Sequence, residues 1–330
     1  MDDKVYLDYI DYYLPQNTVT VDDIFNDLKQ VSRAVYDGID KDEFKKLTKL
    51  NHINIFGGED IVSIIGEMIE KMLRITGIDV SAISYLVCTP DPVMHYGTMS
   101  VIHYMHKKFN MKNAHILPIQ QSCTTSLFAM GLAEKLLNNN EYMLVLCAND
   151  WSGLNNDKEL SHRFLNFTVM GDAIGMLLIG KKRHEGALRI CDWSYSNYGL
   201  SSYDIGNSGD YNKAPVLNRL SMIKEGANFI RRSLERIHVN IHDLEKFIVS
   251  NVRYDVFYNS YSKLLGVTPD IFFLNNVGNG GHANDIDLIR NLKDYILQNK
   301  SSTTHKICLY TLDIEESMDM NYHLVVLQRE

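Results

Sequence analysis

The stretch Leu117-Pro-Ile-Gln-Gln-Ser-Cys-Thr-Thr-Ser-Leu-Phe-Ala-Met130 leads from a short apolar run into a helix-forming run, with Cys123 at the turn. A thiol at a helix N-terminus feels the positive end of the helix dipole and unpaired backbone N–H groups, which stabilise a thiolate. The same N–H groups can bind the oxyanion formed when a thioester carbonyl is attacked. Small neighbours such as Ser122 and Thr124 leave room for a substrate. On chemistry alone, a nucleophile and an inert turn cysteine are equally good interpretations.

The remaining cysteines have a different setting. The chain has five cysteines, an odd number, without Cys-x-x-Cys or Cys/His metal spacing, so we expect neither a disulfide framework nor a metal site. The other four lie in strand-like apolar runs, where a cysteine is usually a small buried hydrophobe. These are Cys88, Cys147, Cys191 and Cys308.

Outward from Cys123, short apolar runs alternate with longer amphipathic segments, which predicts an α/β fold. In the first half the predicted strands are 84–88, 115–119 and 142–147, and the predicted helices are 60–76, 101–109 and 125–137. Gly77 is well placed to end the first of these helices. In the second half we predict strands at 188–194, 247–250, 307–311 and 322–327, and helices at 221–238, 256–265 and 286–298. Two similar halves without a linker suggest an internal duplication, divided at residues 1–180 and 181–330.

Composition narrows the class of protein. With 330 residues, 45% hydrophobic and 22% charged, the chain can bury a large core. A net charge of −8 argues against nucleic-acid binding. Lys224, Arg231, Arg232 and Arg236 can supply a local basic patch for an acidic carrier protein, although such a group is more commonly a solvated helix face. No run approaches the roughly 18 apolar residues of a membrane helix. The acidic N-terminus lacks the pattern of a signal peptide, so we expect a cytoplasmic protein.

Five segments, in order, resemble the β-ketoacyl-acyl-carrier-protein synthase III branch of the thiolase superfamily. They are Ile10-Asp-Tyr-Tyr-Leu-Pro15, Thr76-Gly-Ile-Asp79 through Tyr85-Leu-Val-Cys-Thr-Pro-Asp91, Gln121-Ser-Cys-Thr-Thr-Ser-Leu127, Met170-Gly-Asp-Ala-Ile-Gly-Met-Leu-Leu-Ile-Gly180 and Phe272-Phe-Leu-Asn-Asn-Val-Gly-Asn-Gly-Gly-His-Ala-Asn-Asp285. The resemblance implies a thiolase-like five-layered αβαβα fold of two similar halves, usually a homodimer. It also implies a Cys–His–Asn site, with an acyl group taken from coenzyme A or from the phosphopantetheine arm of an acyl carrier protein.

The chain departs from this pattern at several points. The family asparagine falls on Asn279, but the family histidine falls on Asn251, and an amide cannot accept and return a proton. General-base work contributes about 10²- to 10⁴-fold, so ordinary decarboxylative condensation should be impaired. His282 is the nearest candidate for a replacement base, with His323 next.

Two further departures concern the substrate. The family's glycine-rich loop before the last strand has no glycine here, in Ile314-Glu-Glu-Ser-Met-Asp-Met-Asn-Tyr322. The family has a tryptophan and an arginine near its coenzyme A site, and residues 47–54, the matching region here, contain neither. This difference favours a carrier protein over coenzyme A as the donor of the acyl group.

Three functions follow from the resemblance and the departures. The first is an acyltransferase that forms an acyl-Cys123 thioester and passes the acyl group to an amine, hydroxyl or thiol in a specialised biosynthetic pathway. The second is a decarboxylative carbon–carbon condensing synthase with an atypical Cys–Asn–Asn site. The third is a non-catalytic partner that forms a heterodimer with a competent synthase.

Overall fold

The fold is built on two sets of five strands with the same order and directions. The computed structural model describes residues 4–31, 41–89, 95–96, 99–119, 121–151, 163–165, 168–199, 216–299, 306–314 and 319–329. The first set is β1 (Val5–Tyr13), β11 (Ala173–Gly180), β8 (Tyr142–Asn149), β4 (Ile83–Cys88) and β7 (His115–Pro118). The second set is β12 (Leu188–Gly199), β17 (Asp319–Arg329), β16 (Lys306–Ile314), β13 (Leu244–Val249) and β14 (Phe272–Phe273).

Strand directions repeat across the two sets. β1 and β8 run antiparallel to β11, while β8 and β7 lie parallel to β4. In the same way β12 and β16 run antiparallel to β17, while β16 and β14 lie parallel to β13. A short antiparallel pairing of Val5–Leu7 with Leu188–Ile190 joins the sets edge to edge. The strands therefore form two like five-stranded sheets, one in each half, which this short pairing joins at their edges.

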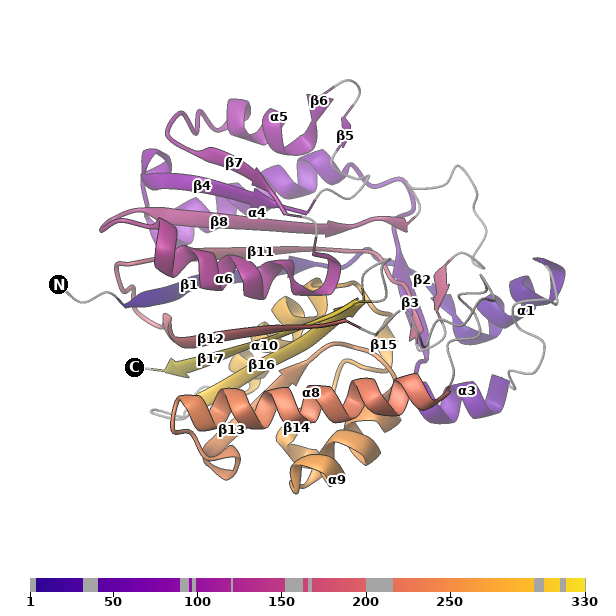
Figure 1. Ribbon diagram of the computed structural model, residues 1–330. Coiled ribbons are helices and arrows are strands. Elements are labelled where there is room, and N and C mark those ends of the chain that lie inside the picture. Colours follow the sequence, from indigo (N-terminus) through magenta and orange to yellow (C-terminus); the bar gives the residue numbers. More distant parts are fainter. Residues whose placement is uncertain are drawn as a thin grey trace.

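Helices lie on both outer faces and between the halves (Figure 1). α4 (Ile61–Thr76) and α5 (Val101–Lys108) pack on the first set. α8 (Val216–Arg236), the π-helix η7 (Val256–Tyr261) and α9 (Ser262–Leu265) pack on the second. α6 (Thr125–Leu136) and α10 (Ile286–Gln298) lie between them. The result is the expected five-layered αβαβα arrangement.

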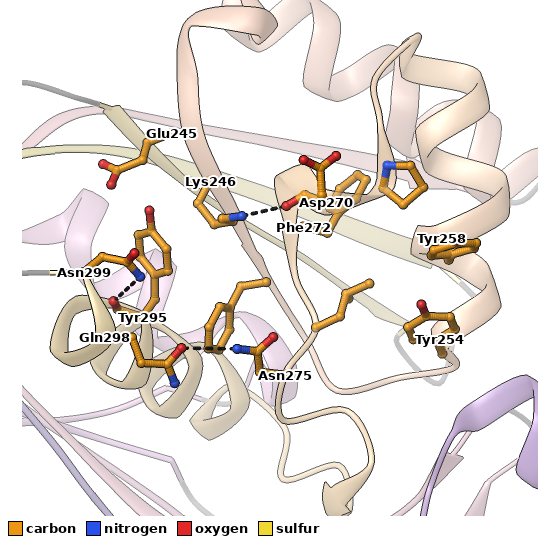
Figure 2. A pocket seen from close by; sticks show the side chains of 13 residues that line it. Glu245, Lys246, Tyr254, Tyr258, Asp270, Phe272, Asn275, Tyr295, Gln298 and Asn299 are labelled. Carbon is orange, nitrogen blue, oxygen red and sulfur yellow. Dashed lines mark hydrogen bonds between the residues drawn. The ribbon is translucent and has the colours of Figure 1, made fainter. Parts of the chain in front are cut away.

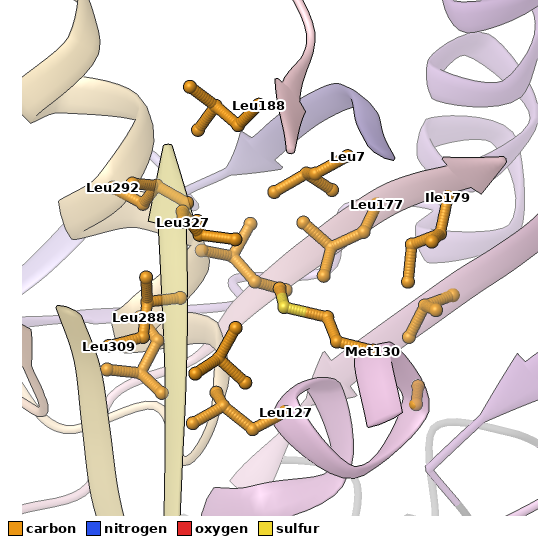
Figure 3. Packing of buried hydrophobic residues seen from close by; sticks show 14 of the residues in the cluster. Leu7, Leu127, Met130, Leu177, Ile179, Leu188, Leu288, Leu292, Leu309 and Leu327 are labelled. Atoms are coloured by element: carbon orange, nitrogen blue, oxygen red, sulfur yellow. The ribbon is translucent and has the colours of Figure 1, made fainter. Parts of the chain in front are cut away.

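The central layer shares its core with both sheets (Figure 3). Leu127 of α6 and Leu288 of α10 are fully buried in one cluster with Leu177 of the first sheet and Leu309 of the second. Burying a leucine side chain completely stabilises a protein by roughly 1.5–3 kcal/mol. Because α6 and α10 bury apolar faces against both sheets, their N-terminal ends are held rigidly relative to each other.

Helix boundaries follow local sequence signals. Asp60 caps α4 by accepting hydrogen bonds from the N–H groups of Val62 (3.1 Å) and Ser63 (3.2 Å). Gly77 ends it in the left-handed conformation with φ 65°, as predicted. The predicted helix at 221–238 begins earlier, at Val216, and ends at Arg236. The predicted helix at 256–265 is a π-helical segment followed by a short α-helix.

Smaller elements complete the structure. β2 (Asn17–Thr20), β3 (His52–Ile55) and β15 (Asn279–Gly280) form a small sheet, covered by α1 (Val21–Val31) and α3 (Lys41–Thr48). Two further pairs are β5 (His95–Tyr96) with β6 (Met99–Ser100), and β9 (Phe164–Leu165) with β10 (Thr168–Val169). The 3₁₀ turns are η1 (Val80–Ala82), η3 (Ser122–Thr124), η6 (Ile241–Asp243) and η8 (Pro269–Ile271). Within the described ranges, every helix is too short or too polar to cross a membrane.

Candidate active site

Cys123 lies at the turn into the central helix α6, as the sequence predicts. The chain leaves β7, forms the 3₁₀ turn η3 around Cys123, and enters α6 at Thr125. The thiol is partly exposed. The Thr124 N–H donates to the Gln121 carbonyl at 2.7 Å, so this N–H is already used within the turn. The cysteine is thus accessible at the end of a helix held firmly in the core.

His282 brings a ring nitrogen to the thiol. Its Nε2 lies 3.4 Å from Cys123 Sγ, although 159 residues separate them in sequence. The His282 backbone is fixed beside the first half: its N–H donates to Val169 O at 2.9 Å, and its carbonyl accepts from Gly171 N at 2.8 Å. His282 is 5% exposed. This is the contact by which the second half completes a site around the cysteine.

Glycines permit this close backbone approach. A Cβ on Gly171 would lie 1.9 Å from the Gly280 carbonyl oxygen. Gly281 has φ 79°, and a Cβ there would lie 2.8 Å from Val169 O. Since a side chain would push the two segments apart, these glycines are what allows His282 to reach Cys123.

Asp287 orients His282 from the opposite side. Its Oδ2 lies 2.5 Å from His282 Nδ1, and the carboxylate also accepts from the N–H groups of Asn251 (2.7 Å) and Ala283 (3.0 Å). A carboxylate only accepts hydrogen bonds, so Nδ1 carries the proton in the neutral imidazole. The Nε2 lone pair therefore faces the thiol. Cys123, His282 and Asp287 form one hydrogen-bonded chain.

Asn251 supports the carboxylate rather than facing the sulfur. Its Nδ2 donates to Asp287 Oδ1 at 3.2 Å, and its Oδ1 accepts from Asn291 Nδ2 at 2.9 Å. The residue is 2% exposed. Both ends of the amide are thus engaged, one with Asp287 and the other with Asn291.

Asn279 belongs to a different part of the structure. It lies in β15, paired with His52 of β3. Its Oδ1 accepts from Asn51 Nδ2 at 3.3 Å, and its carbonyl accepts from Arg290 at 2.7 Å. These bonds tie Asn279 to the small sheet, whereas His282, which follows it by three residues, is the residue of this segment in contact with Cys123.

Sequence reasoning missed Asn284 and Asp285, which contact the nucleophile turn. Cys123 Sγ lies 3.6 Å from Asn284 Oδ1. Asp285 Oδ2 accepts from Ser126 N in the first turn of α6 and from Cys147 Sγ, each at 3.0 Å. Asp287 was also missed. The available signal was the group of polar residues that follows His282 within five positions, on the entry to an amphipathic helix.

His323 is buried in an aromatic environment on β17. It is 2% exposed, accepts from Trp193 Nε1 at 3.4 Å, and packs against the Phe128 ring at 6.1 Å. Burial lowers the pKa of His323 from 6.5 to about 4. It therefore stays neutral near pH 7 and is part of the packing under α6.

Asp172, from the fourth of the segments that resemble the family, is fully buried. Asp172, in the Gly-Asp-Ala segment, binds the loop N–H groups of Phe56 (2.8 Å) and Trp151 (2.9 Å) and pairs with Arg163. Of the glycine-free stretch before the last strand, residues 315–318 lie outside the described residues, as do 90–91 of the predicted Thr-Pro-Asp loop.

Two pockets in the described part of the chain lie away from these residues. One, of about 720 Å³, opens beside the edge strand β14 between Tyr254, Tyr258 and Tyr295 (Figure 2). The other, of about 550 Å³, lies between β12 and α8 and includes Arg232 and Arg236. Neither includes Cys123 or His282 in its lining. Within the described part of the chain, no group of three His, Cys, Asp or Glu side chains is placed to hold a metal ion.

Solved structures share this fold over nearly the whole chain. An acyltransferase named ChlB3 matches with a TM-score of 0.76 and 13% identity, over 99% of this chain and 98% of that one. The 3-oxoacyl-[acyl-carrier-protein] synthase III of Aquifex aeolicus matches with a TM-score of 0.73 and 14% identity, over 98% and 99%. A variant of OleA from Xanthomonas campestris, solved with bound lauric acid and lauroyl-CoA, matches with a TM-score of 0.73 and 14% identity, over 98% and 99%.

No protein-family model matches the chain, and neither does any curated protein. The structural matches nevertheless define the class of fold: the chain has the thiolase fold. Within that class it has the arrangement seen in ketosynthase III enzymes, OleA and ChlB3.

Proposed function

We propose that the protein is an acyltransferase of the ketosynthase III type, in which Cys123 carries the acyl group. The observation that carries this proposal is the chain Cys123 Sγ, His282 Nε2 and Nδ1, and Asp287 Oδ2, with separations of 3.4 and 2.5 Å. A nucleophile beside a base that a third group orients is the arrangement of acyl-transfer enzymes. His282 takes the role of base that the resemblance assigns to the position of Asn251.

In the first half-reaction His282 Nε2 removes the proton from Cys123 Sγ. The sulfur attacks the carbonyl carbon of an acyl thioester, and the carbon–sulfur bond to the donor breaks. The departing thiolate takes the proton from His282, which leaves acyl-Cys123 and a free donor thiol. Asp287 stabilises the imidazolium that exists between these two proton transfers.

In the second half-reaction His282 works again as base. It removes a proton from an amine, hydroxyl or thiol acceptor as that acceptor attacks the acyl carbon. The bond to Cys123 breaks, and the sulfur recovers the proton from His282. The acyl group leaves on the acceptor and the enzyme returns to its starting state.

The donor in this proposal is the phosphopantetheine thioester of an acyl carrier protein or of coenzyme A. The OleA structure with lauroyl-CoA supports a fold able to admit such a thioester. Of the four basic residues that can form a patch for an acidic carrier protein, Arg236 is paired with Asp192 at 2.6 Å and Arg231 with Asn228 at 3.2 Å, so Lys224 and Arg232 are the stronger candidates. We also propose that the protein is a homodimer and that it acts in the cytoplasm.

The alternatives have less support. Carbon–carbon condensation needs donors that bind the thioester carbonyl, yet Asn251 Nδ2 donates to Asp287, and Asn279 lies in the small sheet, where its amide contacts Asn51. A non-catalytic heterodimer partner needs no nucleophile, so this role does not explain why His282, oriented by Asp287, lies beside the Cys123 thiol.

Intact-protein mass spectrometry tests the proposal. Purified protein is incubated with a panel of acyl-coenzyme A and acyl-carrier-protein thioesters, beside Cys123→Ala and His282→Ala. We expect a mass gain of one acyl group in the wild type, none in C123A, and acylation slower by about 10²- to 10⁴-fold in H282A. A folded wild-type protein that gains no mass from any donor would overturn the proposal in favour of the partner role.

A further inference from the structure

Asn284 presents an amide group to the sulfur of Cys123 from a second direction. Its Oδ1 lies 3.6 Å from Sγ, and the residue is partly buried. Asn284 has φ 53°, a left-handed conformation that asparagine tolerates better than most residues. The same sulfur has His282 Nε2 at 3.4 Å.

A chain of hydrogen bonds fixes which end of the Asn284 amide faces the sulfur. Asn149 Nδ2 donates to the Gly171 carbonyl at 2.6 Å, and a carbonyl can only accept. Asn149 must therefore turn its Oδ1 toward Asn284, whose Nδ2 donates to it at 3.0 Å. Asn149 is 3% exposed at the end of β8, so water does not replace these bonds. As a result, the carbonyl oxygen of Asn284 points at Cys123.

The acyl-enzyme is thus flanked by two hydrogen-bond acceptors, His282 Nε2 and Asn284 Oδ1. A carbon nucleophile brings no N–H to them, and an alcohol or thiol brings a single proton, which His282 takes. A primary amine has two N–H groups and a lone pair. It can donate one N–H to each acceptor while its lone pair faces the acyl carbon.

We infer that the acceptor is a primary amine and that Asn284 is the residue that selects it. This inference rests on the proposed acyl transfer and narrows its acceptor class. The amine nitrogen bonds to the acyl carbon, the carbon–sulfur bond breaks, and the proton from the amine passes through His282 to Cys123 Sγ. The products are an amide and the free thiol.

Asn284→Gly gives the test because glycine keeps the left-handed backbone and removes only the amide. Asn140→Gly is the matched control, since Asn140 also has a positive φ, of 65°, but is exposed in the turn after α6. Cys123 is loaded with the donor that gives an adduct by mass spectrometry, and transfer to ethylamine, ethanol and ethanethiol is timed. We expect N284G to slow transfer to ethylamine about 3- to 10-fold more than transfer to the other two, the size of one hydrogen bond. N140G should match the wild type.

A second measurement compares ethylamine with its isomer dimethylamine, which has one N–H. The wild type should favour ethylamine beyond the ratio seen for uncatalysed aminolysis of the same thioester, and N284G should lose that preference. An equal effect of N284G on all acceptors, or a wild-type ratio no higher than the uncatalysed one, would overturn the inference while leaving acyl transfer intact. Failure of Cys123 to load would instead overturn the proposed function and the inference together.

Discussion

His282 Nδ1 and Asp287 Oδ2 lie 2.5 Å apart, and both residues are almost completely buried, at 5% and 2% exposure. The pair is local: Asp287 lies in the first turn of α10, five residues after His282, and also binds the Ala283 N–H. The orientation of the His282 ring is therefore set locally, by the first turn of α10. The contact between His282 and Cys123, in contrast, depends on the packing of the two halves against each other.

Asp287→Asn should impair catalysis. An asparagine can turn its Nδ2 toward His282, which would favour a proton on Nε2 and remove the lone pair that faces Cys123. We expect the rate of Cys123 acylation to fall by about 10²- to 10⁴-fold. Stopped-flow or quenched mass spectrometry measures this rate, with exposed Asp243→Asn as the control. Acylation within about threefold of the wild type would show that His282 does not need Asp287.

Asn251→Ala should destabilise the protein by about 1–3 kcal/mol, because Asp287 Oδ1 and Asn291 Nδ2 each lose a partner in a buried site. Urea unfolding measures the change. Asn113→Ala is a suitable comparison: Asn113 is exposed and donates to the Ser81 carbonyl at 2.9 Å, so its loss should cost under about 0.5 kcal/mol. If both variants were equally stable, the network behind Asp287 would carry no stabilising energy.

Much of the fold could be predicted from hydrophobic pattern. The helix at 286–298 was predicted at its observed boundaries, and the buried strand at 84–88 to within one residue, because their apolar periodicity is strong. β2 and β3 were not predicted: each has four residues, and most of β2 is exposed, so neither carries a clear pattern.

The candidate site was less predictable for a physical reason. The position of Cys123 at a strand-to-helix turn is a local property and could be read from the sequence. Asn279 and His282 are three residues apart, and spacing alone does not say which one meets Cys123. That choice is made by the close approach of Gly171 to Gly280 and Gly281, a contact between segments more than 100 residues apart.

His323 should make stability depend on pH. Burial lowers the pKa of His323 from 6.5 to about 4, so the unfolded chain takes up a proton at this residue before the folded protein does. Stability is therefore fully present above about pH 6.5 and is lost as the pH falls toward 4, by about 3 kcal/mol from this residue. His323→Gln keeps an acceptor for Trp193 and should remove the contribution of this residue to the pH dependence of the unfolding free energy. Urea unfolding of both proteins between pH 4 and 8 measures it, and parallel curves would contradict the prediction.

Asp8→Asn should stabilise the protein above neutral pH. Burial raises the pKa of Asp8 from 3.8 to about 7, against a weaker opposite effect of the His184 N–H, and in the described part of the chain Asp8 Oδ2 has no hydrogen-bond partner. Between those two pH values the folded protein holds a proton that the unfolded chain has lost, so stability falls as the pH rises from about 4 to about 7. The asparagine variant carries no charge and escapes this loss.

We expect D8N to match the wild type near pH 4 and to exceed it at pH 8 by about 2–4 kcal/mol in urea unfolding, the lower value reflecting partial contact with solvent. Glu185→Gln, which removes an exposed carboxylate from the same turn as His184, should follow the wild type across the range. A D8N curve parallel to that of the wild type would mean that Asp8 is ionised in the folded protein at neutral pH.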